Sequence, residues 1–307
     1  MVVRAEAGRA AAVRPPSRAL EWLGGQRWIV LLARRKVALI GAALLAVMLV
    51  LGLVGPLVAG NPSHMDVAAR LRPPSFANWF GTDDVGRDVF SRVIYGARLS
   101  LLVGGAVVVF SFVVGIVCGV LAGYFQRLDN AVMRVMDGLM AFPAIILAIA
   151  LMASLGPSVA NVIVAIGVVN SPRVARVVRG SVLVVRETAY VEAGRALGAS
   201  DLALICRHVL PNCLSPVIVQ ASFVFAAAVL TEAALSFLGV GVPPFVPSWG
   251  NILSDGRLYL RQAPWLVLYP GAAIMLTIFG LNMFGDGLRD MLDPKIRGLQ
   301  TERQRAA

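Results

Sequence analysis

Charged residues are scarce in this chain of 307 residues. They make up 15% of the sequence, whereas 58% of the residues are hydrophobic, and the mean hydropathy is +0.78. Soluble globular domains are about a quarter charged and about half apolar. The composition therefore excludes a soluble globular domain and predicts an integral membrane protein, which has the lipid bilayer as its first partner.

Lysine is almost absent. Lys36 follows Arg35 and Lys295 follows Pro294, and there is no other lysine. A phosphate-binding P-loop needs a Gly-Lys-Ser/Thr sequence, because the lysine and the backbone amides hold the phosphates. The chain therefore lacks the motif for binding ATP itself, and we expect it to bind no cofactor.

Histidine and cysteine are also rare. The two histidines, His64 and His208, are predicted on opposite sides of the membrane, so they cannot join one catalytic set. The three cysteines, Cys118, Cys206 and Cys213, show neither metal-ligand nor redox spacing and are interpreted as packing residues. We expect no catalytic residue, no metal site and no enzyme activity.

Long apolar runs are what the chain does have. About 20 residues cross a hydrocarbon core of about 30 Å at 1.5 Å per residue. The first run has 23 residues, which exceeds the roughly 7 to 15 of a cleaved signal, so it is interpreted as a retained span. We predict an all-α polytopic membrane protein with six transmembrane helices: Val37–Ala59, Leu99–Phe125, Gly138–Leu155, Val159 to about Val178, Leu214–Gly241 and Pro264–Gly285.

The basic residues indicate how these spans are oriented. There are 28 basic against 17 acidic residues. With the N-terminus inside, the inner segments hold 21 of the basic residues and the outer segments, 60–98 and 242–263, hold 7. The positive-inside rule then places both termini in the cytoplasm. The positive excess follows from this topology, so nucleic acid is not expected as a partner.

One polar segment between the fourth and fifth predicted spans interrupts the apolar pattern. It reads "YVEAGRALGASDLALICRHVLPN" from Tyr190. A helix-forming run, 192–197, is followed by Gly198, and glycine is favoured after a helix because it tolerates a positive φ. Ser200 or Asp201 then offers an N-cap for a second short helix.

The second short helix is predicted over 202–210, with Pro211 as its stop. Two short helices held by a glycine corner would form a rigid knob, suited to receive force from a partner. From the residues alone, a surface hairpin that only connects two spans is an equal alternative.

The segment "EAGRALGASDLALICRHVLP" resembles the EAA loop of ABC-importer permeases. That pattern is Glu-Ala-Ala, three residues, Gly, nine residues and Ile-x-Leu-Pro. Gly194 and His208 depart from it, at the positions of the second alanine and the isoleucine. The resemblance assigns ATPase coupling to the loop 187–213, with the residues Glu192, Ala193, Gly194, Gly198, Ala199, Ser200, His208, Leu210 and Pro211.

Three further stretches extend the resemblance along the chain: "GTDDVGRDVFSRVIYGARLSL", "EAALSFLGVGVPP" and "GDGLRDMLDPKIRG". Together they resemble the second permease subunit of dipeptide, oligopeptide, nickel and glutathione importers. The resemblance implies a type I ABC importer permease fold and a multi-pass protein of the bacterial inner membrane. It also implies half of a translocation pore, completed by a second, homologous permease.

The resemblance further implies one or two cytoplasmic ATPase subunits, which bind the ATP, and an extracytoplasmic substrate-binding protein. An ion-gradient-driven secondary transporter is the alternative, although several buried ionisable groups or internal repeats would then be expected. The predicted organisation is a basic tail (1–36), a first transmembrane helix (37–59), an extracytoplasmic segment with an amphipathic helix (60–98), a core permease domain (99–285) and a C-terminal tail (286–307).

Two further features remain open at this stage. The amphipathic helix is predicted to lie along the membrane surface before the second span, with Asp83, Asp84 and Asp88 on a solvated, salt-bridged face rather than in a metal site. Both outer segments either meet the binding protein or simply cap the bundle. Glu232, the single acidic residue inside a span, is either a gate residue or a hydrogen-bonding residue of the bundle.

Overall fold

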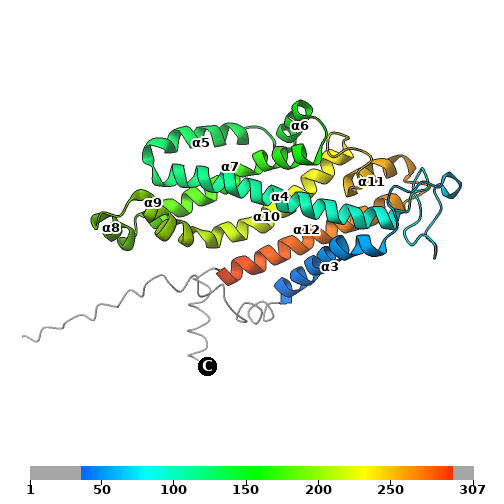
Figure 1. Ribbon diagram of the computed structural model, residues 1–307, viewed down its shortest axis with the longest axis horizontal. Helices are drawn as coiled ribbons and strands as arrows, with labels where there is room; N and C mark the ends of the chain where they lie inside the picture. Colours follow the sequence, from blue (N-terminus) through cyan, green and yellow to red (C-terminus); the bar gives the residue numbers. More distant parts are fainter. Residues whose placement is uncertain (1–35, 293–307) are drawn as a thin grey trace, which may run out of the picture.

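The computed structural model describes residues 36–292, and the helix labels in Figure 1 begin at α3. Within this range the chain is helical, with one isolated β-bridge between Thr82 and Asp88. The predicted all-α fold is confirmed. The elements are α3 (Lys36–Val58), η1 (Val67–Ala69), α4 (Val89–Tyr124), α5 (Gln126–Met140), α6 (Ala144–Leu155), α7 (Val159–Arg186), α8 (Ala189–Ala196), α9 (Asp201–Leu204), η2 (Ile205–Val209), α10 (Leu210–Phe237), α11 (Trp249–Gly256), η3 (Arg257–Tyr259) and α12 (Trp265–Leu292).

Five helical segments of the described chain are long and apolar enough to cross a membrane: α3, α4, α7, α12 and the continuous run from α9 to α10. A sixth crossing is possible only as the pair α5 and α6, which is bent by 91°. The third span predicted over Gly138–Leu155 is therefore present only as part of this bent pair, not as one continuous helix. The helix breaks before Pro143, because the residue preceding a proline is pushed out of the α region.

The helices α4 and α7 lie side by side along most of their length (Figure 1). Gly115 and Gly119 of α4 make this possible, since a Cβ on either residue would approach the Cβ of Val174 or Val178 to 2.6 Å. These glycines recur every four residues along α4 and let the backbones of the two helices approach closely. On the other side of the bundle, α3 packs along α12 (Figure 1).

The fourth predicted span is longer than expected, because α7 continues to Arg186. Pro172 lies inside this helix, and Ser171 and Asn170 each bond a carbonyl of the preceding turn. The arginines beyond the apolar part of α7 pair with α5: Arg176 contacts Asp137 and Arg179 contacts Asp129, each at 2.6 Å between nitrogen and oxygen. These two ion pairs dock α5 against α7.

The separate surface helix predicted before the second span is not present. Residues 89–98 form the first turns of α4 instead, and Asp88 is the N-cap, accepting hydrogen bonds from Ser91 N at 2.8 Å and Ser91 Oγ at 2.7 Å. These turns are covered by α11, whose buried Trp249 donates from Nε1 to the Val93 carbonyl at 3.0 Å. The apolar side of this amphipathic stretch therefore packs against protein, not against the membrane surface.

Candidate functional site

The polar segment forms a knob, defined here as residues 189–209, at one end of the helical bundle (Figure 1). Its first arm is α8, which ends in a Schellman motif: Ala199 N donates to the Gly194 carbonyl at 3.1 Å and Gly198 N to the Arg195 carbonyl at 3.0 Å. Gly198 has a φ of +82°. The predicted glycine corner is therefore present.

The second arm begins at Ser200, whose Oγ accepts a hydrogen bond from Ala203 N at 3.4 Å. It continues through α9 and the π-helical turn η2 directly into α10. Pro211 is thus not a helix stop, and that prediction is wrong. The proline lies in the first turn of α10, where the widened hydrogen-bonding pattern of the preceding π-turn tolerates a missing amide donor.

Both departures from the loop pattern have a local explanation. A Cβ at Gly194 would meet the side chain of the buried Leu204 at 2.8 Å, so the glycine lets the second arm close on the first. His208 is half-buried, and its ring lies 6.2 Å from that of Tyr190, between their centroids. Neither departure alters the glycine corner.

The knob has a buried side and an exposed apolar side. Val191, Ile205 and Val209 are buried in the same cluster as Val182 of α7, which fixes the knob to the bundle. Glu192, Ala193, Gly198, Ala199 and Ser200 are exposed, whereas Leu210 and Pro211 are half-buried. Leu197 and Leu202, on either side of the corner, are 89% and 71% exposed. Such a tip suits contact with another protein.

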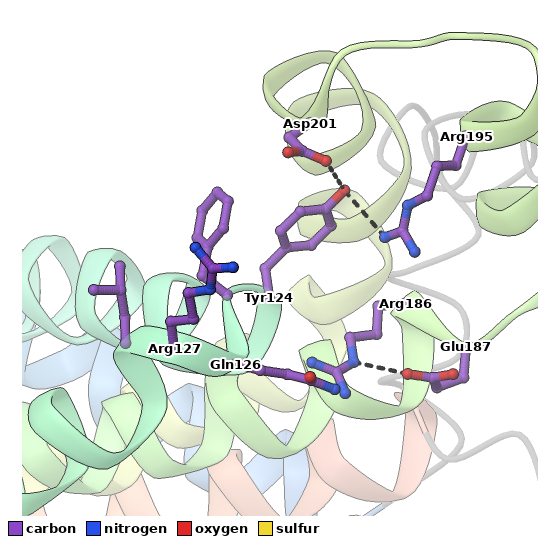
Figure 2. Close-up of a pocket in the computed structure, with 9 residues that line it drawn as sticks. Tyr124, Gln126, Arg127, Arg186, Glu187, Arg195 and Asp201 are labelled. Carbon is purple, nitrogen blue, oxygen red and sulfur yellow. Dashed lines mark hydrogen bonds and ion pairs between the residues drawn. The ribbon is translucent and has the colours of Figure 1, made fainter.

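A tyrosine outside the knob joins its two arms (Figure 2). The hydroxyl of Tyr124, at the end of α4, donates to Asp201 Oδ1 at 2.7 Å and accepts from Arg195 Nη2 at 3.4 Å. The latter hydrogen bond raises the pKa of Arg195, whose guanidinium group is in any case always charged in a protein. Sequence reasoning missed Tyr124, whose only signal is its place where an apolar run ends.

A cleft of about 630 Å³ lies beside this tyrosine (Figure 2). It is formed where α4 turns into α5, facing the end of α7 and both arms of the knob. Its lining combines three arginines with two acids and two apolar side chains. The lining residues are Tyr124, Phe125, Gln126, Arg127, Leu128, Arg186, Glu187, Arg195 and Asp201.

A charged cluster lies at the opposite end of the bundle, the α11 end. Asp83 Oδ2 is 2.6 Å from both Arg87 Nε and Arg92 Nη1, and Asp255 of α11 contacts Arg92 Nη1 at 3.1 Å. The predicted salt bridges are confirmed, but the predicted solvated face is wrong for Asp83, because Asp83 and Arg92 are both buried. Burial, and then repulsion by Asp83 and Asp255, raise the pKa of Asp84.

Glu232 is fully buried in α10. Its Oε2 accepts from Ser100 Oγ of α4 at 3.1 Å, and its Oε1 accepts from Ser236 Oγ at 2.9 Å. No basic side chain of the described chain is paired with it. Glu232 thus makes a hydrogen bond between the packed helices α4 and α10. This is the bundle role considered for it above, as opposed to the role of a gate residue.

The architecture is that of a polytopic helical membrane protein with a polar loop projecting from one end of the bundle. Residues 111–298 match the family described as "Binding-protein-dependent transport system inner membrane component". The chain belongs to this family, and it is a multi-pass permease component of an ABC importer of the inner membrane, not an enzyme.

Individual relatives agree with this assignment. The chain is 44% identical over 268 residues to the dipeptide transport system permease protein DppC of Alkalihalophilus pseudofirmus, covering 87% of this chain and 88% of the relative. It is 43% identical over 225 residues to the glutathione transport system permease protein GsiD of Pectobacterium atrosepticum, covering 73% and 75%.

A solved structure of the inward-facing MetNI methionine ABC transporter has the same fold, with a TM-score of 0.56 at 20% identity, covering 66% of this chain and 96% of that one. The comparisons support the importer over an ion-driven secondary transporter.

Proposed function

We propose that this chain forms one half of a pore that imports peptides, and that the knob docks into a separate ATPase subunit that binds the ATP. A second, homologous permease completes the pore, one or two ATPase subunits bind from the cytoplasm, and a binding protein delivers the substrate from outside. The observation that carries the proposal is the exposed apolar tip, Leu197 and Leu202, on a corner held rigid by Gly198.

The proposed orientation places the knob and both termini in the cytoplasm. It rests on the 21 basic residues of the inner segments against 7 in the outer ones. The α11 end then faces outward. Exposed apolar residues at that end, Phe76, Trp79, Phe245 and Leu258, suit a surface that receives the binding protein.

The proposed substrate class is a short peptide. The two relatives described above are named for dipeptide and glutathione transport, and glutathione is itself a peptide. A dipeptide and a tripeptide share a charged amino group, a carboxylate and an amide. We therefore assign peptides rather than nickel to this importer.

The test compares two glycines that both have a positive φ. Gly198 and Gly156 have φ values of +82° and +81°, and a Cβ at either meets nothing within 4 Å. A valine at either position thus adds backbone strain of about 1–3 kcal/mol without a clash. Only Gly198 lies in the knob; Gly156 connects α6 to α7 at the far end of α7.

Both variants should reach normal membrane levels. Gly198→Val should lose the ATPase subunits on purification and reduce ATP-dependent peptide uptake at least tenfold, whereas Gly156→Val should keep both. Glu192→Lys should act like Gly198→Val by reversing an exposed charge of the first arm. If Gly198→Val and Glu192→Lys held the ATPase as tightly as Gly156→Val, the knob would be only a connector.

A further inference from the structure

The cleft beside the knob contains more positive than negative charge. Arg127, Arg186 and Arg195 line it, against the two carboxylates Glu187 and Asp201. Both carboxylates already have partners: Glu187 Oε1 accepts from Arg186 Nε at 2.9 Å, and Asp201 accepts from the Tyr124 hydroxyl. The acids therefore leave positive charge in the cleft without a partner.

Arg127 supplies most of this uncompensated charge. It forms no hydrogen bond or ion pair with any residue in the described range 36–292. The guanidinium of Arg195 lies over the Tyr124 ring, 5.8 Å from its centroid, and makes one hydrogen bond of 3.4 Å to the Tyr124 oxygen, so most of its five N–H groups have no acceptor. Two guanidinium groups that have N–H donors without an acceptor thus line the same cleft. This arrangement fits a phosphate or a carboxylate.

The depth of the cleft in the membrane indicates which anion can reach it. No charged residue lies between Arg98 and Arg127, and α4 covers nearly all of that interval, ending at Tyr124. Its uncharged part is about 39 Å long at 1.5 Å per residue, whereas the hydrocarbon core is about 30 Å and the whole bilayer about 40–45 Å. The end of α4, and the cleft beside it, therefore lie at the depth of the lipid headgroups.

The rim of the cleft is apolar on the side of α5. Phe125 and Leu128 line it, and Leu128 and Val135, which share a face of α5, are 42% and 60% exposed. A ligand in this cleft would therefore place an anionic group against arginines and an apolar part along α5. A phospholipid has this distribution of charge and hydrocarbon, and basic pockets between transmembrane helices bind such headgroups.

We propose that the cleft formed by Arg127, Arg195 and the apolar rim of α5 is a binding site for the headgroup of an anionic phospholipid. The site requires only that the chain spans a membrane, and it does not depend on the knob docking into an ATPase. It places the lipid phosphate next to the residues that join the two arms of the knob.

The test measures lipid retention by the full-length chain in its purified complex. The complex is incubated in non-ionic detergent with equal amounts of phosphatidylglycerol and phosphatidylcholine, and the bound lipids are counted by native mass spectrometry. Arg127→Gln removes a side chain without a partner, so no other bond is lost. Arg134→Gln is the matched control, because Arg134 is an exposed arginine seven residues further along α5 that does not line the cleft.

Arg127→Gln should lower the preference for phosphatidylglycerol about tenfold, the factor expected from losing one charged hydrogen bond. Arg127→Lys and Arg134→Gln should each retain most of the preference. The basic tail 1–36 attracts anionic lipid equally in every variant, so it cancels in the comparison. Equal retention by Arg127→Gln and the parent, or an equal loss in Arg134→Gln, would overturn the proposal.

A competition experiment with inorganic phosphate separates a lipid from a soluble anion. If phosphate displaced phosphatidylglycerol at matched concentration, the cleft would bind a soluble anion instead, and the proposal would be wrong.

Discussion

The hydroxyl of Tyr124 donates a hydrogen bond to Asp201 across 2.7 Å, which connects the end of a membrane-spanning helix to the second arm of the knob. The same oxygen accepts from Arg195 of the first arm. One phenol group therefore bridges both sides of the Gly198 corner. Movement of the knob should thus reach α4 directly, as well as α7 and α10, to which the knob is covalently connected.

Tyr124→Phe should weaken this connection without unfolding the chain. The ring keeps its edge-on contact with Phe125, whereas the two hydrogen bonds are lost, about 1–3 kcal/mol in total. We expect normal ATPase retention but several-fold less peptide imported per ATP hydrolysed, measured in proteoliposomes.

Tyr95→Phe provides the control for that prediction. It removes a hydroxyl that donates to the Pro56 carbonyl from the same helix, away from the knob. The double variant Tyr124→Phe/Asp201→Asn should be no worse than Tyr124→Phe, because both changes remove one interaction. Additive losses, or equal losses in Tyr95→Phe, would show that the bridge does not transmit movement.

The proposed orientation can be tested by cysteine labelling. Ser200 lies in the knob and Ser75 in the loop at the α11 end, and both are exposed. Because Cys206 is also exposed, the native cysteines must first be replaced by serine. A membrane-impermeant thiol reagent should label Ser75→Cys in intact cells, and Ser200→Cys only in inverted vesicles. The reverse pattern would contradict the positive-inside assignment.

Glu232 offers a test of hydrogen bonding against gating. Glu232→Gln can still accept from one serine and donate to the other, so it should retain stability and uptake. Glu232→Ala leaves the hydroxyls of Ser100 and Ser236 without their partner and should destabilise the fold by about 1–3 kcal/mol, measured by thermal unfolding in detergent. A fully stable Glu232→Gln variant without uptake would instead indicate a gate.

Arg92 should be essential for the stability of the α11 end. Arg92→Met leaves Asp83 buried with one fewer cation, and breaking a buried ion pair in this way costs about 3–5 kcal/mol. Thermal unfolding should report a clearly lower midpoint. Arg87→Met should have a smaller effect, because Arg87 is more exposed.

Asp84→Asn should act in the opposite direction. The folded protein raises the pKa of this carboxyl, so the ionised form is disfavoured by folding and stability decreases as the pH rises through that pKa. Removing the charge should raise the unfolding midpoint at neutral pH by about 1–2 °C. A lower unfolding midpoint would contradict this prediction, because it would show that the charge of Asp84 stabilises the fold despite Asp83 and Asp255 nearby.

The sequence by itself determined the features that depend on local chemistry. Apolar length placed five long spans and Gly198 marked the corner, because both follow from hydrophobicity, helix geometry or allowed φ values. The family, in contrast, was indicated by the resemblance of the loop around Glu192 to a known motif.

Only the tertiary structure decided which polar groups meet. Tyr124 and Asp201 are 77 residues apart, and Arg92 and Asp255 are 163 apart, so no periodicity could pair them. It also decided that residues 89–98 face protein rather than lipid, because an amphipathic pattern shows that a face is covered but not by what. Pro211 was misjudged for the same reason: a proline stops a helix only if no local rearrangement accommodates it, and here the π-turn before it does.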